Sequence, residues 1–122
     1  MEQKKKLLLV DDDLIKFSDI FQSSLQPYGV ILDMAGDFDT ALAKAKSRQF
    51  DLIIVDIGLF GPFTGVDLVR AIRKIDTKTP IYILTAYGQE YQEEAEQSGA
   101  NRYFVKPLDP AKHILKPLGL LA

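Results

Sequence analysis

Residues 7–14 read Leu-Leu-Leu-Val-Asp-Asp-Asp-Leu. Four apolar residues run directly into three carboxylates. Neighbouring carboxylates repel one another and raise each other's pKa, so the arrangement is electrostatically unfavourable by itself. Either these acids are only turn and cap residues, or a positive charge lies between them. The rest of the sequence decides between the two interpretations.

The run at residues 7–10 is the first of five short apolar segments spaced along the chain. Most of them are β-branched or aromatic and apolar on both faces, which is typical of strands covered on two sides. The segment at 30–35 is more polar, and we expect it at an edge of the sheet. The predicted strands are Leu7–Val10, Val30–Ala35, Leu52–Val55, Ile81–Leu84 and Tyr103–Val105.

Segments with helical periodicity separate the apolar runs. Asp13 is expected to be the N-cap of the first helix, and Pro27 and Gly29 are its stop signals. The second helix follows the sequence "GDFDT" at residues 36–40. The apolar positions that mark the first three helices are Phe17, Ile20, Phe21 and Leu25, then Leu42 and Ala45, then Val66, Val69 and Ile72.

The last two helices are short of apolar residues. In "GQEYQEEAEQSG", residues 88–99, only Tyr91 and Ala95 could anchor a helix, and Gly99 ends it. The fifth helix is expected to start with Asp109 as N-cap and Pro110 at its first position.

Pro117 shortens the fifth helix. A proline inside a helix removes a hydrogen bond and clashes, so we expect about six or seven helical residues and then an irregular apolar tail. The tail residues Leu118, Leu120 and Leu121 either fold back onto the core or meet a partner. His113, the only histidine, is expected on the surface.

Strands and helices alternate along the chain, which predicts an α/β fold of the (βα)5 type. Short links between them imply right-handed crossovers and a doubly wound parallel sheet with helices on both faces. The length of 122 residues suits one domain, so we expect a single domain over residues 1–122.

The composition excludes several classes of protein. An apolar content of 47% is too high for a disordered chain, and a net charge of −2 gives no sign of direct nucleic-acid binding. The absence of cysteine excludes disulfides, thiol catalysis and cysteine-ligated zinc. No apolar run approaches the ~20 residues that span a bilayer, so we expect a cytoplasmic domain with no membrane contact. The basic run Lys4-Lys5-Lys6 is interpreted as a solvated lead-in to the first strand, with an anionic partner as the minor alternative.

Polar side chains stand where four of the predicted strands end. Asp11 and Asp12 end the first strand, Asp56 the third, Thr85 the fourth and Lys106 the fifth. In a parallel sheet these ends gather at one edge, where ligands bind. We therefore expect the five side chains to converge.

Each of these residue types suits one part of a phosphoryl-transfer site. Three carboxylates make an oxygen cage of the kind that Mg²⁺ prefers. A lysine is a point charge suited to a phosphoryl group, and a threonine hydroxyl can donate to a phosphoryl oxygen. Together they predict phosphoryl transfer to an aspartate nucleophile.

The ordered set of an acidic pair, Asp56, Thr85-Ala86 and Lys106-Pro107 resembles the receiver domain of two-component response regulators. The resemblance covers nearly the whole chain, from "LLLVDDD" to "VKPLDP". It implies a flavodoxin-like fold, like that of the chemotaxis regulators, with strand order 2-1-3-4-5. It also implies a phosphorylation-controlled switch rather than a turnover enzyme. Its partners would be a histidine kinase or phosphotransfer protein, or a small phosphodonor, and a downstream protein controlled through the face of the fourth helix, fifth strand and fifth helix.

The resemblance assigns roles at the acidic site. Asp56 would accept the phosphoryl group, and Asp11, Asp12, Asp56 and the backbone carbonyl of Gly58 would hold Mg²⁺. Lys106 would pair first with Asp56 and then with the phosphoryl oxygens.

The resemblance also assigns the switch. The Thr85 hydroxyl would bond the phosphoryl group, the Ala86 N–H would support it, and Tyr103 would turn inward on activation. The Lys106–Pro107 bond would be cis. From its position alone, Tyr87 at the rim is a candidate to shield the phosphoryl group from water.

The loop "DIGLFGPFTGVDL", residues 56–68, departs from the family pattern. Phe60 takes the place of a proline, and Gly65 falls nine residues after Asp56 instead of eight, as if one residue had been inserted. Phe60 and Phe63 either pack over the site or present a partner surface. Gly58 replaces a larger side chain and leaves the phosphoryl position less shielded.

Other functions fit the sequence less well. A receiver-like module that binds partners without phosphorylation remains the alternative. An aspartate phosphatase tends to have a second carboxylate where Gly58 stands, and a flavin carrier would need a phosphate loop where "DDDLIK" repels phosphate. The chain is either a stand-alone receiver or a part of a longer protein.

Overall fold

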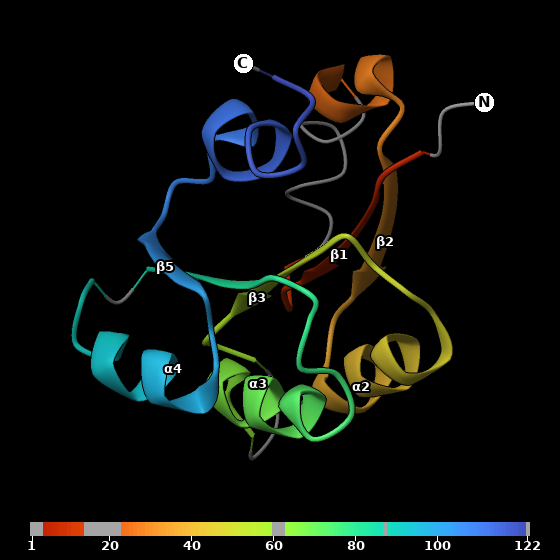
Figure 1. Cartoon of the computed structure of the whole chain (residues 1–122). Helices are drawn as coiled ribbons and strands as arrows, with labels where there is room; N and C mark the ends of the chain where they lie inside the picture. The colour runs from red at the N-terminus through yellow and green to blue at the C-terminus, as the bar shows by residue number, and fades with distance from the viewer. Residues whose placement is uncertain (1–3, 14–22, 60–62, 87, 122) are drawn as a thin grey trace.

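The computed structural model describes residues 4–13, 23–59, 63–86 and 88–121. All five strands pair in parallel in one sheet of order β2-β1-β3-β4-β5 (Figure 1). The predicted architecture, the strand order and the edge position of the second strand are confirmed. The strands are β1 (Lys6–Val10), β2 (Ile31–Ala35), β3 (Leu52–Asp56), β4 (Ile81–Thr85) and β5 (Arg102–Val105).

Helices cover both faces of the sheet (Figure 1). Three lie side by side on one face, namely α2 (Phe38–Ser47), α3 (Gly65–Arg73) and α4 (Gln92–Ser98). On the other face lie a helical turn at 23–25 with the 3₁₀ turn η1 (Gln26–Tyr28), and the π-helical turn η2 (Ala111–Leu115). The predicted first helix, with Phe17, Ile20 and Phe21, lies outside the described residues except for its end. In the described part of the chain, no helix has the length and apolarity to cross a bilayer.

Side-chain alternation along the strands builds two cores. In β1, Leu8 and Val10 face α2, α3 and α4, whereas Leu7 and Leu9 face the opposite side. Because successive strand residues point to opposite faces, a continuous apolar run fills both cores at once. The predicted anchor Leu25 is buried in the second core, with 1% of its surface exposed.

The helices on the first face begin and end at recognisable signals. Asp37 accepts the Thr40 N–H at 2.7 Å and so caps α2. Thr64 and Asp67 form a reciprocal capping box at the start of α3. Gly99 adopts the left-handed conformation that ends α4, as its position predicts.

The Arg73 guanidinium ties together the segments that follow α3 and α4. It donates to the carbonyls of Gly99 at 2.9 Å, Thr79 at 2.8 Å and Asp76 at 3.1 Å, and to the Asn101 side chain at 2.9 Å. Four hydrogen bonds from one planar group fix the entry into β4 and β5.

The prediction for His113 is wrong. Its side chain is buried, with only 6% of its surface exposed, and its ring packs on Phe104 with 4.3 Å between centroids. Its Nδ1 accepts the Asp109 N–H at 2.9 Å. The π-helical turn explains the error, because its wider spacing buries His113, Ile114 and Leu115 in succession.

The remaining predictions for the C-terminal segment hold in outline. The Asp109 carboxylate accepts the Ala111 and Lys112 N–H groups at 3.1 and 3.3 Å, but η2 begins at Ala111 with Pro110 as its N-cap, one residue later than predicted. The helical turn is slightly shorter than expected. Leu118 is buried against the second core, so at least this part of the apolar tail folds back.

We expect His113 to make the folded state less stable in mild acid. Burial lowers the pKa of His113, assisted by Lys112 and opposed by Asp109. As pH falls, the unfolded chain therefore binds a proton before the folded chain does. The stability that this histidine contributes is present above its ordinary pKa of about 6.5 and is lost as pH falls below it. Urea unfolding at pH about 7.5 and about 5.5 measures this loss as a lower midpoint at the lower pH.

His113→Asn is the matched variant, since an asparagine oxygen can still accept the Asp109 N–H but does not titrate. The variant should lose stability at both pH values and show a smaller difference between them. An unchanged difference would refute the assignment.

Candidate functional site

The register of the sheet brings the polar strand ends to one edge. Val10 pairs with Val55, so Asp11 and Asp56 follow at the same level. Thr85 pairs with Val105, the residue before Lys106. The predicted convergence is therefore present.

Lys106 supplies the positive charge that the three acids require. Its ammonium lies 3.1 Å from an oxygen of Asp11 and 3.1 Å from an oxygen of Asp56. Both carboxylates are buried, with 2% and 8% of the residue surface exposed. Two buried carboxylates thus share one ammonium group.

Backbone N–H groups hold the other oxygens of the same carboxylates. Asp11 accepts the Asp13 N–H at 2.9 Å, and Asp56 accepts the Gly58 N–H at 3.2 Å. These bonds fix the direction in which the chain leaves β1 and β3. The helix that Asp13 was predicted to cap lies outside the described residues.

The acids are placed as a hard divalent cation requires. One oxygen from each of Asp11, Asp12 and Asp56 lies within 4.8 Å of the others. Asp12 is exposed while the other two are buried, so the group opens to solvent on one side. A donor set of carboxylate oxygens alone fits Mg²⁺ and is unlike the nitrogen and sulfur sets that zinc prefers.

Acidic groups outnumber basic ones at the site in the part of the chain that the structure describes. Burial raises the pKa of Asp56, and the nearby charge of Asp11 raises it further, against the opposing hydrogen bond from Lys106. Burial and the neighbouring Asp11 also raise the pKa of Asp12. Burial alone would lower the pKa of Lys106, but its bonds to Asp56 and Asp11 outweigh this effect and raise it. Lys106 therefore stays charged, and within the described residues three acids face this one cation.

Comparison with known families decides the identity of the fold. The family model for the response regulator receiver domain matches residues 7–116, which is most of the chain.

The chain is a response regulator receiver domain.

Two-component regulators are among the relatives of this receiver domain. It is 32% identical to the transcriptional regulatory protein ResD of Bacillus subtilis over 95% of the chain and 48% of that protein. It is 36% identical to the two-component response regulator PhoP of Pseudomonas aeruginosa, over 84% of the chain and 45% of that protein. The chain spans between 23% and 50% of the length of such curated relatives.

Solved receiver structures share the fold. The chemotaxis protein CheY4 of Vibrio cholerae has a TM-score of 0.81 and 34% identity, covering 98% of this chain and all of that one. The response regulator TrrA of Thermotoga maritima, solved in complex with Mg(2+)-BeF, has a TM-score of 0.78 and 30% identity. That match covers 96% of this chain and 99% of TrrA.

The predicted switch residues of this receiver domain lie at the end of β4, which pairs with β3, and on β5. Thr85 is fully buried at the end of β4, and Ala86 after it is exposed. Tyr103 on the neighbouring strand is half-buried, and its hydroxyl donates to the Gly88 carbonyl at 2.6 Å. The contact with Gly88, just before α4, was not predicted. Tyr87 lies outside the described residues.

The unusual loop of this receiver domain is described only at its ends. Phe60 lies outside the described residues. Phe63 is 48% exposed, and its ring lies 4.7 Å from that of Phe38, the first residue of α2. Phe63 therefore packs against the start of α2, and about half of its surface still faces solvent.

Two backbone features support the site. The Lys106–Pro107 bond is cis, as the resemblance implies. A Cβ on Gly65 would lie 2.1 Å from the Asp56 carbonyl oxygen, so α3 can start this close to β3 only with glycine. The sequence showed the spacing of Gly65 from Asp56 but not this contact.

Proposed function

We propose that this receiver domain is a phosphorylation-controlled signalling switch whose acceptor is Asp56. The observation that carries the proposal is the buried Asp56 carboxylate beside Lys106, with Asp11 and Asp12 at the same strand edge. Two related proteins support it: TrrA was solved with Mg(2+)-BeF, and a Burkholderia pseudomallei response regulator, at 26% identity, with a phosphorylated aspartic acid. The donor would be a phosphohistidine of a histidine kinase or phosphotransfer protein, or a small phosphodonor.

Asp11, Asp12 and Asp56, with the Gly58 carbonyl, would hold Mg²⁺. When bound, the ion would neutralise charge on the phosphoryl group and on the acids around it. The carboxylate set fits this role because it offers only hard oxygen donors within reach of one another.

The chain's own residues carry the transfer. An Asp56 oxygen forms the new O–P bond while the P–N bond to the donor imidazole breaks, and that bond's electron pair leaves with the imidazole. Lys106 stays protonated and moves from the carboxylate to the phosphoryl oxygens. Such transfer depends mainly on positioning and charge neutralisation, which this arrangement supplies.

The phosphoryl group would then act on the fourth helix. The Thr85 hydroxyl and the Ala86 N–H would turn to its oxygens, and Tyr103 would leave the Gly88 carbonyl and move inward. Among the residues of α4, only Ala95 and Ser98 are buried, so little apolar contact resists its displacement. The face of α4, β5 and η2 would change and control a downstream protein.

Intact-mass measurement with a small acyl phosphate tests the proposal. We expect wild-type protein with Mg²⁺ to gain one phosphoryl mass, and the Asp56→Asn variant or a chelator to abolish the gain. Asp39→Asn, on the exposed first turn of α2, is the matched control and should be modified normally.

Phosphorylation of Asp56→Asn to the same extent as wild type would show that another residue is the acceptor. A folded wild-type protein that takes up no phosphoryl group from any donor would favour the alternative, a module that binds partners without phosphorylation.

A further inference from the structure

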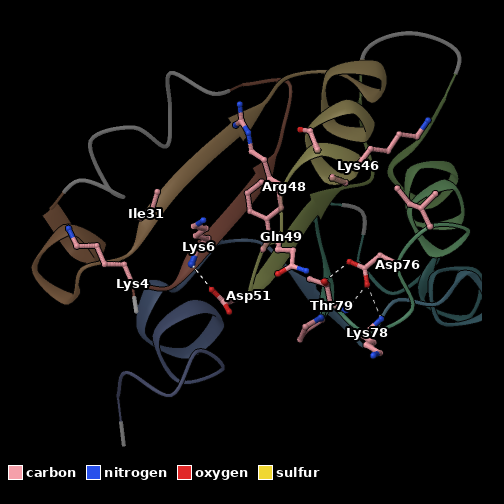
Figure 2. A pocket seen from close by; sticks show the side chains of 15 residues that line it. Lys4, Lys6, Ile31, Lys46, Arg48, Gln49, Asp51, Asp76, Lys78 and Thr79 are labelled. Carbon is pink, nitrogen blue, oxygen red and sulfur yellow. Dashed lines mark hydrogen bonds between the residues drawn. The ribbon is translucent and has the colours of Figure 1, made fainter. Parts of the chain in front are cut away.

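An open groove of about 1050 Å³ lies where the strands begin, at the end of the sheet away from Asp56. Its walls come from the segments that lead into the strands: the start of β1, residues 45–51 before β3, and residues 75–80 before β4. Figure 2 shows Lys4 and Lys6 on one side, and Lys78 with Asp76 on the other. The groove is thus separate from the phosphoryl site.

The groove concentrates positive charge against the sign of the whole molecule. The chain has 15 basic and 17 acidic residues, but five basic and two acidic residues line this groove. The basic ones are Lys4, Lys6, Lys46, Arg48 and Lys78.

The two carboxylates of the groove are already engaged. Asp51 accepts the Lys6 backbone N–H at 2.8 Å. Asp76 accepts the backbone N–H groups of Lys78 and Thr79, at 2.9 and 3.0 Å, and the Thr79 hydroxyl. Within the described residues, neither carboxylate forms an ion pair with a lysine. The ammonium groups of Lys6 and Lys78 likewise have no ion-pair partner there.

The end of a helix accounts for only two of the five cations. Lys46 and Arg48 lie at the end of α2, where its carbonyl dipoles favour positive charge, and Arg48 also pairs with Asp33. Lys4 and Lys6 lead into a strand instead, where no helix end requires them.

Apolar side chains share the lining with the cations. Ile31 and Ile75 are 45% and 49% exposed, and Phe50, which also lines the groove, is buried. Such a mixture suits a protein segment, whose apolar side chains can cover the isoleucines while its carboxylates meet the lysines.

We propose that this groove binds a short acidic segment of a partner protein, with apolar residues between its carboxylates. Duplex DNA fits less well, because it would use none of the apolar surface and its long phosphate array would meet the net negative charge of the rest of the molecule. The interaction lies outside the proposed switch and does not require a phosphoryl group on Asp56.

Fluorescence anisotropy on the whole chain tests this assignment. The probe is a dye-labelled synthetic peptide of glutamates interrupted by isoleucines. We expect saturable binding that Lys6→Glu with Lys78→Glu weakens by about tenfold or more. A peptide with glutamine for glutamate should bind poorly, and Asp56→Asn should bind like wild type.

Lys112→Glu with Lys116→Glu is the matched control, because it changes the net charge equally at two exposed lysines outside the groove. Thermal unfolding checks that each variant folds. If Lys6→Glu with Lys78→Glu does not fold, Lys6→Gln with Lys78→Gln, which removes the two charges without reversing them, takes its place. No saturable binding, equal weakening by the control pair, or tighter binding of duplex DNA at the same salt would each overturn the proposal.

Discussion

Replacing Gly65 with alanine should lower the free energy of unfolding by about 3 kcal/mol or more, since the new methyl group meets backbone. The added Cβ would lie 2.1 Å from the Asp56 carbonyl oxygen and 2.9 Å from the Ile57 Cα. Backbone atoms at the end of a central strand cannot rotate away as a side chain can. The start of α3 must therefore move, although the Gly65 N–H is bonded to the Ile57 carbonyl at 2.9 Å. In a domain of this size the melting temperature should fall by roughly 10 °C.

Gly29→Ala is the matched control for this prediction. Gly29 has a φ of +73°, but nothing lies within 4 Å of its would-be Cβ, so alanine there costs only left-handed strain of about 1 kcal/mol. Gly65 is not among the glycines with positive φ, so its penalty is steric. Equal melting temperatures for the two variants would contradict the close contact.

Replacing Lys106 with methionine should slow phosphoryl uptake by about a hundredfold or more, if Asp56 is the acceptor. Methionine keeps the apolar stem but removes the ammonium that lies 3.1 Å from both Asp11 and Asp56. Among the described residues, no other side-chain ammonium would then lie beside these buried carboxylates to meet the charge that builds up with the incoming phosphoryl group. The rate of mass gain with a small acyl phosphate and Mg²⁺ measures the effect.

Lys112→Met serves as the control, because it removes the same charge from an exposed position outside the site. Lys106→Arg should give an intermediate rate, since its charge remains but its planar fork does not match a point charge. Uptake by Lys106→Met at the wild-type rate would remove Lys106 from the proposed transfer.

The sequence predicts the strands and the site well for a single physical reason. Parallel pairing fixes which residues share a level, so once Leu7–Val10 and Leu52–Val55 are identified as strands, Asp11 and Asp56 must follow at one edge. Every strand end lies within one residue of its predicted position. The carboxylates that follow Leu7–Val10 called for a positive charge nearby. Lys106, which is far along the chain, supplies it.

The sequence fails where side-chain direction depends on geometry that pattern does not encode. His113 looked exposed because a regular helix was assumed, and a π-helical turn buries it. The sequence analysis made no prediction for Arg73, whose guanidinium bonds three carbonyls and an amide. The tyrosine bond from Tyr103 to Gly88 depends on the path of a loop, which no local propensity determines.

The bridge from Lys106 to Asp11 joins residues 95 positions apart. The ribosome must therefore synthesise β5 before the carboxylates of Asp11 and Asp56 gain their shared ammonium partner. A polypeptide that lacks Lys106 would lack the one ammonium group that these two carboxylates share. If Asp56 is the phosphoryl acceptor, its site is therefore complete only after β5 has been synthesised and has paired with β4.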